Sequence, residues 1–314
     1  MSTFLLWGFS SFPDLQSLLF VVIFFSHVTI LAANVSIMVA IKLSHNLHTP
    51  MYFFLCGLSF SETYTTMVII PLMLVDLLSD SKTISLPECA IEMFFFFGLS
   101  GNNCFIMVAM SYDRYIAIYN PLHYAIQMTH QIFFQLMMAS EWLGSWFPCS
   151  SSSLYSTCLC DSNTIQHFFC DISPLVSLAC DYTLYHQMAI FVLSAFVLVG
   201  SFILIIISYV FIGSIVMKKS SAKGKHKAFS TCSSLLTVVC IHYGLSRFVY
   251  LRPKDRDSFC EDILMAVTYT VLTPLLNPIV YSLRNKEMQI ALRKVQDIAN
   301  RFIPQKVDKR TLNT

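Results

Sequence analysis

Long stretches without charged residues decide the fold of this chain, and the longest of them contains QMAIFVLSAFVLVGSFILIIISYVFIGSIVM, from Gln187 to Met217. A helix of roughly 20 apolar residues crosses the hydrocarbon core of a bilayer, so this stretch is long enough to span it. Six other stretches have the same character, and each holds at most one acidic residue: Ser17–Ile41, Tyr52–Val75, Met93–Tyr112, Gln131–Cys149, Ala228–Ser246 and Ile263–Leu283. The sequence therefore predicts seven membrane-spanning helices.

The composition agrees with a membrane protein. Of the 314 residues, 55% are hydrophobic and only 12% are charged, and the mean hydropathy is +0.63. Soluble domains carry about 25% charged residues, so this composition excludes a cytosolic enzyme. The sequence also lacks the series of short segments with alternating polarity that indicates a transmembrane β-barrel. The predicted fold class is an all-α membrane protein, a seven-transmembrane helix bundle, and the net charge of +2 does not favour nucleic acid as a partner.

The distribution of Lys and Arg predicts the orientation in the membrane. Fifteen of the 20 lie in one set of loops and in the C-terminal region, with the largest groups at 218–227 and 284–310. Because positively charged loops stay in the cytosol, we expect a cytosolic C-terminus and, with seven spans, an extracellular N-terminus in the plasma membrane. No basic n-region or small-residue cleavage site precedes the first span, so that span is expected to act as an uncleaved signal anchor.

Five of the 11 cysteines lie in or near the loops of the predicted outer face: Cys89, Cys158, Cys160, Cys170 and Cys180. Thiols outside the cytosol oxidise, so disulfides that staple an outer loop are the first interpretation. The connectivity does not follow from the sequence alone. Metal binding by His167 and Cys170 is the alternative, and it is disfavoured because a cysteine held in a disulfide is a poor ligand.

Four motifs in fixed order carry a family resemblance. They are LHTPMYFFL at 47–55, MSYDRYIAIYNPLHY at 110–124, KAFSTCSS at 227–234 and PLLNPIVYSLRNK at 274–286. With these motifs the chain, from about Gly8 to Lys294, resembles the rhodopsin-like G-protein-coupled receptors and, among them, the tetrapod olfactory receptors. The resemblance implies a receptor and not an enzyme. It also implies small volatile odorants as ligands and a heterotrimeric stimulatory G protein as partner, with a rise in cAMP as the output.

Two of these motifs are candidates for G-protein coupling and activation. A charge inside the bilayer costs roughly 3 kcal/mol or more, so Arg114, at the end of the third span, requires a partner, and Asp113 is adjacent. Proline removes a backbone donor and clashes with the preceding turn, so Asn277-Pro278 predicts a hinge in the seventh span. The resemblance assigns coupling or activation roles to Asp113, Arg114, Tyr115, Asn277, Pro278 and Tyr281.

Glu62 is the one acidic residue in the second span, and acids inside the membrane are functional by default. The resemblance places Asn103 and Asn277 near it, in a polar site that can hold an allosteric sodium ion; no other cofactor is implied. Most members of the family carry Asp at this position. The alternative is a protonated, hydrogen-bonded Glu62 without an ion. Asn34 of the first span is expected to join this network.

The ligand site is expected between helices, in the half of the bundle toward the outer face. Residues at helical spacing mark one face on each of the third, fifth and sixth spans. The predicted ligand-binding residues are Phe97, Ser100, Gly101, Cys104, Leu193, Ser194, Val197, Tyr243, Arg247 and Tyr250. Such stripes also arise from ordinary helix packing. For Arg247, pairing with an outer-loop acid such as Asp181 is the alternative to ligand binding.

The resemblance further implies two disulfides, Cys89–Cys170 and Cys160–Cys180, which leave Cys158 free or paired elsewhere. After the seventh span, apolar residues at helical spacing predict a short amphipathic eighth helix on the inner leaflet: Met288, Ala291, Leu292, Val295 and Ile298. The predicted organisation is an extracellular tail at 1–16, a receptor domain at 17–283, and a cytoplasmic amphipathic helix and tail at 284–314.

Rival classes of membrane protein lack their expected features. A retinal protein needs a lysine in the seventh span, and Ile263–Leu283 contains none. A transporter or channel of small molecules is the remaining alternative. It is disfavoured because transporters show internal repeats with broken helices in both halves, which this sequence does not show.

Overall fold

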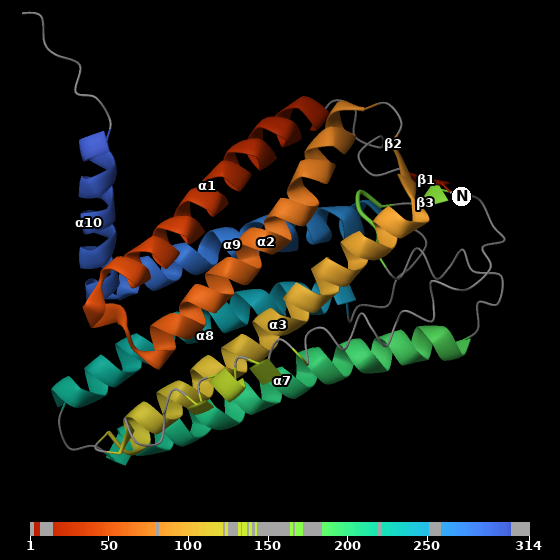
Figure 1. Cartoon of the computed structure of the whole chain (residues 1–314). Coiled ribbons are helices and arrows are strands. Elements are labelled where there is room, and N and C mark those ends of the chain that lie inside the picture. The colour runs from red at the N-terminus through yellow and green to blue at the C-terminus, as the bar shows by residue number, and fades with distance from the viewer. Residues whose placement is uncertain are drawn as a thin grey trace, which may run out of the picture.

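The computed structural model describes residues 3–6, 15–79, 82–121, 123–124, 131–132, 134–136, 138–139, 142, 164–165, 167–171, 184–218, 222–250 and 259–302. Within them the chain forms long helices and three short strands (Figure 1). The helices are α1 Gln16–Leu43, α2 Pro50–Leu78, α3 Leu86–Tyr119, α7 Leu184–Lys218, α8 Ala222–Tyr250, α9 Phe259–Arg284 and α10 Lys286–Phe302. A short 3-10 helix, η3, covers His45–Leu47 between α1 and α2.

Six of the seven predicted spans correspond to described helices, each longer than the span predicted for it. The difference is largest for α3, which begins at Leu86 and ends at Tyr119, whereas the predicted span covers Met93–Tyr112. Hydropathy marks only the part of a helix in the lipid core, and the helices continue beyond that part. The fourth predicted span, Gln131–Cys149, is described only in part, and its Glu141 lies outside the described residues.

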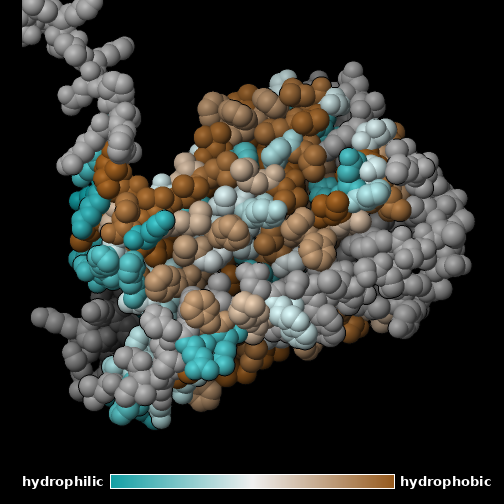
Figure 2. Space-filling model, in the orientation of Figure 1, coloured by the Kyte–Doolittle hydropathy of each residue, from teal (hydrophilic) through white to brown (hydrophobic). Residues whose placement is uncertain are grey.

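Among the described residues, five helices have the length and composition to cross a membrane: α1, α2, α3, α7 and α9. The sixth, α8, contributes a shorter apolar section from Leu235 to Val249, because its first turns are rich in lysine. Figure 2 shows hydrophobic residues over most of the visible flank of the bundle and hydrophilic ones gathered at the end beside α10. The apolar flank is the surface that lipid covers. The chain is a seven-transmembrane helix bundle with a short amphipathic eighth helix.

The helices pack side by side in chain order, α1 on α2, α2 on α3, α7 on α8 and α8 on α9, while α9 returns to α1 and α3 packs along α7. Two clusters of buried side chains fill the bundle. One contains Cys89, Phe168 and Ile263. It lies at the end of the bundle where Cys89 is bonded to Cys170, the disulfide end. The other contains Leu47 and Met110 and lies toward the opposite end, the Arg114 end, where α3 finishes just after Arg114.

A three-stranded sheet lies at the disulfide end, formed by β1 Thr3–Leu6, β2 Lys82–Ser85 and β3 Thr164–Ile165. The strand order is β2-β1-β3, with β1 antiparallel to β2 and parallel to β3. The segment 1–16, expected from its sequence to be a plain tail, therefore contains the middle strand of a sheet.

The eighth helix, α10, turns away from the bundle at the Arg114 end (Figure 1). It packs against α1, α9 and η3. Met288 and Ala291 are buried, Leu292 and Val295 pack against the same cluster, and Ile298 is exposed. Only part of the predicted apolar face is therefore buried. The first turns of α10 pack against the end of α1, and the later turns extend beyond the bundle.

Candidate functional site

The predicted ligand-binding face of α3 points into the bundle. Gly101 and Cys104 are buried, Phe97 is buried in the cluster of the disulfide end, and Ser100 is half-buried. Helical spacing places these positions on one side of α3, and the neighbouring helices cover that side. This face of α3 is therefore available to a ligand only from within the bundle.

Tyr243 of α8 ties two helices together at the centre of the bundle. Its hydroxyl donates to Oγ of Ser201 on α7 at 2.7 Å, and its side chain is only 8% exposed. Ser201 in turn donates to the backbone carbonyls of Val197 and Leu198. The hydroxyl of Ser201 thus gives the buried phenol of Tyr243 a hydrogen-bond acceptor where water does not reach it. Val197, one turn before Ser201, packs against both buried clusters.

A second polar contact joins α3 to α8 at the same depth. Sγ of Cys104 lies 3.5 Å from Nε2 of His242. The ring of His242 also contacts Tyr269 of α9, with centroids 5.7 Å apart, and the Tyr269 hydroxyl lies close to Ser100 and Ser246. Sequence reasoning missed His242 and Ser201 as members of this site. His242 is adjacent to Tyr243 in the sequence, and Cys104 was predicted to lie on the inner face of α3. These two facts could have indicated that His242 belongs to the site.

The remaining predicted ligand residues lie in different surroundings. Leu193, Ser194 and Val197 of α7 are half-buried. Arg247, one turn beyond Tyr243 on α8, is exposed, and the side chain of Tyr250 lies outside the described residues. Phe97, Leu193 and Val197 thus share the cluster of the disulfide end, and Cys104 and Tyr243 share the other cluster, against which Val197 also packs. Arg247 lies at the surface of the bundle.

A polar centre joins α2 and α9. Nδ2 of Asn277 donates to Oε1 of Glu62, and both side chains are buried, as is Asn103 of α3. Oε2 of Glu62 and the Oδ1 atoms of Asn103 and Asn277 accept no hydrogen bond from any described residue. Buried polar atoms without partners are costly, so Glu62 and Asn277 offer two oxygen atoms to an additional group, and Asn103 carries a third such oxygen on α3.

A side chain of α1 satisfies the backbone carbonyl that Pro278 leaves without a donor in α9. Proline has no backbone N–H, so Pro278 leaves the carbonyl of Pro274, four residues earlier, without its helical donor. Nδ2 of Asn34 on α1 donates to that carbonyl at 3.3 Å, and also to the carbonyl of Ile30 at 3.1 Å. A side chain of a neighbouring helix thus satisfies the break, as lipid surroundings require. The side chain of Tyr281 lies outside the described residues.

At the Arg114 end, Asp113 is buried and accepts a hydrogen bond of 2.7 Å from the hydroxyl of Tyr124. Burial and the adjacent Asp113 carboxylate raise the pKa of Tyr124, so this phenol remains a donor at neutral pH. Arg114 is half-buried, as is Tyr115. The charge of Arg114 acts on Asp113, on Tyr209 of α7 and on Cys232 of α8.

Tyr52, the buried tyrosine in the first motif, links α2 to the junction of α9 and α10. Nδ2 of Asn285 donates to its hydroxyl at 2.7 Å, and the hydroxyl lies 3.3 Å from Oε2 of Glu287. Asn285 also caps α10, because its Oδ1 accepts from the backbone N–H of Glu287 and Met288. The motif at 47–55 indicated a family resemblance, but no role for Tyr52 was predicted from it.

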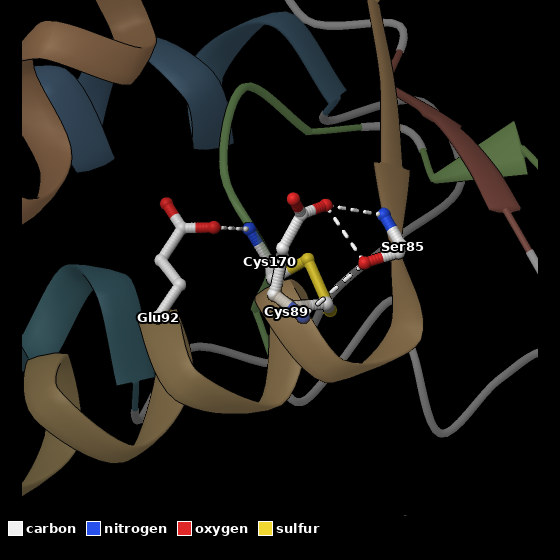
Figure 3. The surroundings of a disulfide bond; sticks show 5 residues. Ser85, Cys89, Glu92 and Cys170 are labelled. Carbon is white, nitrogen blue, oxygen red and sulfur yellow. Dashed lines mark hydrogen bonds between the residues drawn. A yellow bond between two sulfur atoms is a disulfide. The ribbon is translucent and has the colours of Figure 1, made fainter.

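The predicted disulfide between Cys89 and Cys170 is present, with the two Cα atoms 5.4 Å apart (Figure 3). Glu92, one turn along α3, accepts a hydrogen bond of 3.4 Å from the backbone N–H of Cys170. Ser85 and Glu88 cap the start of α3 reciprocally. Cys158, Cys160 and Cys180 lie outside the described residues, so the predicted Cys160–Cys180 bond stays a prediction. Within the described part of the chain, no three His, Cys, Asp or Glu side chains group as metal ligands.

Comparison with known proteins agrees with this arrangement. A model of the olfactory receptor family matches residues 20–297. Human olfactory receptor 10T2 is 49% identical over 94% of this chain and 94% of its own length. Human olfactory receptor 10Z1 is 50% identical over 92% and 93% of the two chains, and mouse olfactory receptor 10J5 is 46% identical over 92% and 94%.

The helical membrane bundle, together with the match to the olfactory receptor family, defines a multi-pass membrane receptor of the G-protein-coupled class. Since the family model covers most of the chain, and relatives of nearly equal length share almost half of its residues, the chain belongs to the olfactory receptor family. This is a family of signalling receptors and not of enzymes.

Proposed function

We propose that this protein is an odorant receptor that activates a stimulatory G protein and thereby raises cAMP. Family membership supports odorant recognition. The observation that carries the location of the ligand site is the buried contact of Tyr243 with Ser201, next to Cys104 and His242. There α3, α7 and α8 meet around a few polar atoms in an otherwise apolar interior.

The chemistry of this interior favours small, mostly apolar molecules with one polar group. The α3 and α7 positions around it contribute hydrocarbon from Phe97, Leu193 and Val197 and single hydroxyls from Ser100 and Ser194. Ligand sites are mostly apolar, with a few polar groups that set orientation. A volatile alcohol, aldehyde, ketone or ester matches this composition.

The proposal is tested with a panel of such volatiles on transfected cells that co-express the stimulatory G protein, with cAMP as the readout. We expect a dose-dependent rise in cAMP for some members of the panel and no rise in cells without the receptor. If the receptor reaches the cell surface and no volatile of any class raises cAMP, the assignment is wrong.

Tyr243→Phe is expected to reduce the potency of an activating odorant. The variant keeps the ring and deletes the hydroxyl that donates to Ser201. In the proposed site the same hydroxyl also orients the polar group of the odorant. One hydrogen bond lost there costs roughly 0.5–1.5 kcal/mol, and 1.4 kcal/mol of binding free energy corresponds to about a tenfold change in potency. Maximal response should fall as well, because Tyr243 contacts α7 and would move with α8. The measurement is a cAMP dose–response curve at equal surface expression.

Tyr64→Phe is the matched control for Tyr243→Phe, because Tyr64 of α2 is exposed on the lipid side of the bundle. The potency of the odorant on Tyr64→Phe should equal its potency on the wild type. Tyr243→Ala should do worse than Tyr243→Phe, since it also opens a cavity. Unchanged potency and maximal response in both Tyr243 variants would contradict the location of the ligand site.

The proposed orientation places the disulfide end outside the cell and the Arg114 end in the cytosol of a plasma-membrane receptor. Disulfides persist in the oxidising exterior, which supports the first part. The second part rests on the Lys and Arg residues of the loops and C-terminal region. In this orientation Arg114 and Tyr115 lie on the side of the G protein, with Asp113 buried beside them, while Asn277 and Pro278 act as the hinge that moves Tyr281.

We further propose that the polar centre of Glu62, Asn103 and Asn277 holds a sodium ion. Hard cations such as Ca²⁺ and Mg²⁺ take oxygen ligands, and Na⁺ shares that preference. The three oxygens without described partners fit this need, and the Glu62 carboxylate supplies the charge. An ion there would hold α2, α3 and α9 together and favour the resting arrangement, because a ligand shifts the equilibrium toward the state that binds it better.

Replacement of sodium by choline at constant ionic strength is therefore expected to raise odorant potency in the wild type by about fivefold, within the usual range of coupling between two sites. In Glu62→Gln, which keeps the shape but removes the charge, potency should no longer depend on sodium. The measurement is the cAMP dose–response curve in both media. Equal sodium dependence in the wild type and in Glu62→Gln would contradict the ion site.

A further inference from the structure

The N-terminal strand β1 holds the sheet of the disulfide end together. It lies between β2 and β3, which are not neighbours of each other in the strand order. Thr3 to Leu6 pair with Ser85 to Lys82, and Leu5 and Leu6 pair with Thr164 and Ile165. Without β1, both other strands would lose their backbone partners in this sheet. The first residues of the chain thus join the loop before α3 to the loop that carries Cys170.

The two side chains at the centre of β1 point in opposite directions, as alternation along a strand requires. Phe4 is 0% exposed and Leu5 is 37% exposed. Phe4 belongs to one contiguous buried cluster with Phe97 and Phe168, against which Leu193 and Val197 also pack. Phe4, the fourth residue of the sequence, therefore packs in the same cluster as three of the predicted ligand-binding residues.

We propose that β1 is the roof of the ligand site and that Phe4 closes it, so that β1 must detach from β2 for an odorant to enter or leave. This inference rests on the proposed odorant-receptor function. A strand of four residues, paired with one strand of four residues and one of two, belongs to the part of a fold that opens most easily. Because Phe4 is the inward side chain of that strand, its removal from the cluster opens the site from outside.

A cross-link between β1 and β2 tests whether the roof must open. Leu5 and Thr83 are register partners, and both side chains are exposed, so Leu5→Cys with Thr83→Cys places two thiols within disulfide reach without altering the core. Peptide mapping would establish the link. In the linked receptor we expect odorant-evoked cAMP to rise at least about tenfold more slowly at unchanged surface expression, as for a site behind a closed lid. A mild reductant should restore the wild-type rate.

The single variants Leu5→Cys and Thr83→Cys, treated with the same oxidant and reductant, are the controls, and both should respond like the wild type. The Cys89–Cys170 bond is fully buried, and peptide mapping of the wild type after the reductant checks that this bond stays intact.

Truncation of the closing side chain is the second test. Phe4→Ala should reduce odorant potency by about tenfold, since it removes a large buried ring from the wall of the site, and Phe4→Leu should recover part of the loss. Leu5→Ala is the matched control on the other face of the same strand and should leave potency within about twofold of the wild type, as surface substitutions do.

The outcomes separate this inference from the function on which it rests. If the wild type responds to an odorant and the linked receptor responds equally fast, the roof is overturned while the receptor assignment stands. If the two thiols do not link, β1 does not pair with β2 in this register, and the roof is likewise overturned. If no odorant activates the wild type although the link forms, the receptor assignment fails and the roof fails with it.

Discussion

Arg114→Ala is expected to abolish odorant-stimulated cAMP while the receptor remains at the cell surface. Arg114 is the only Lys or Arg in α3, and its charge reaches groups on α7 and α8. The adjacent Asp113 accepts a hydrogen bond from the hydroxyl of Tyr124, and Arg114 is half-buried at the end of α3 that faces the cytosol in the proposed orientation. Loss of this cation removes the strongest hydrogen-bond donor from the surface that the G protein would meet.

Two variants give this prediction its controls. Arg114→Lys keeps the charge but loses the planar fork of donors, so we expect a weak residual response. Arg293→Ala removes an exposed cation from α10 and should signal normally. Surface labelling of an N-terminal epitope checks that each variant is delivered equally. Full signalling by Arg114→Ala at wild-type surface levels would refute the coupling role.

Cys89→Ser is expected to remove the receptor from the cell surface and, with it, every odorant response. The bond to Cys170 joins α3 to the loop that carries β3, and both cysteines are completely buried. Removal of a native disulfide typically costs about 2–5 kcal/mol, which is comparable to a large part of the stability of an ordinary domain. The variant also leaves a serine hydroxyl and an unpaired thiol within an aromatic cluster.

Cys170→Ser should match Cys89→Ser, because each variant breaks the same bond, and the double variant should be no worse than either. Cys240→Ser is the control, since this free cysteine of α8 is exposed to the membrane side of the bundle. The measurement is surface expression followed by cAMP response. Wild-type surface levels and responses in both single variants would show that the disulfide is dispensable.

The membrane-spanning helices could be predicted from the sequence because one solvent imposes one rule on all of them. Inside a bilayer every backbone polar group must be paired within its own segment, so a long uncharged stretch such as Gln187–Met217 has to be helical. The same reasoning, with helical spacing, placed Gly101 and Cys104 on the inner face of α3. The pairing of Cys89 with Cys170 followed from the family resemblance and not from physics.

Partners across helices could not be predicted in this way. Helical spacing shows which face of α8 carries Tyr243, but the choice of Ser201 as its acceptor depends on how α7 and α8 are rotated and how deep each one lies. The same spacing grouped Arg247 with Tyr243, although packing buries one and exposes the other. These choices depend on the fit of whole side chains along the interface.

The sequence by itself determined that this protein spans a membrane as a helical bundle, which stretches lie within its helices, and which polar residues are candidates for function because lipid penalises them. Only the tertiary structure decided that Asn34 satisfies the carbonyl freed by Pro278, that Tyr52 contacts Asn285 at the start of α10, and that Phe4 of the N-terminal strand packs in the buried cluster of the disulfide end. The physical reason is range: hydropathy and helical period act over neighbouring residues, whereas these contacts join residues more than 70 positions apart.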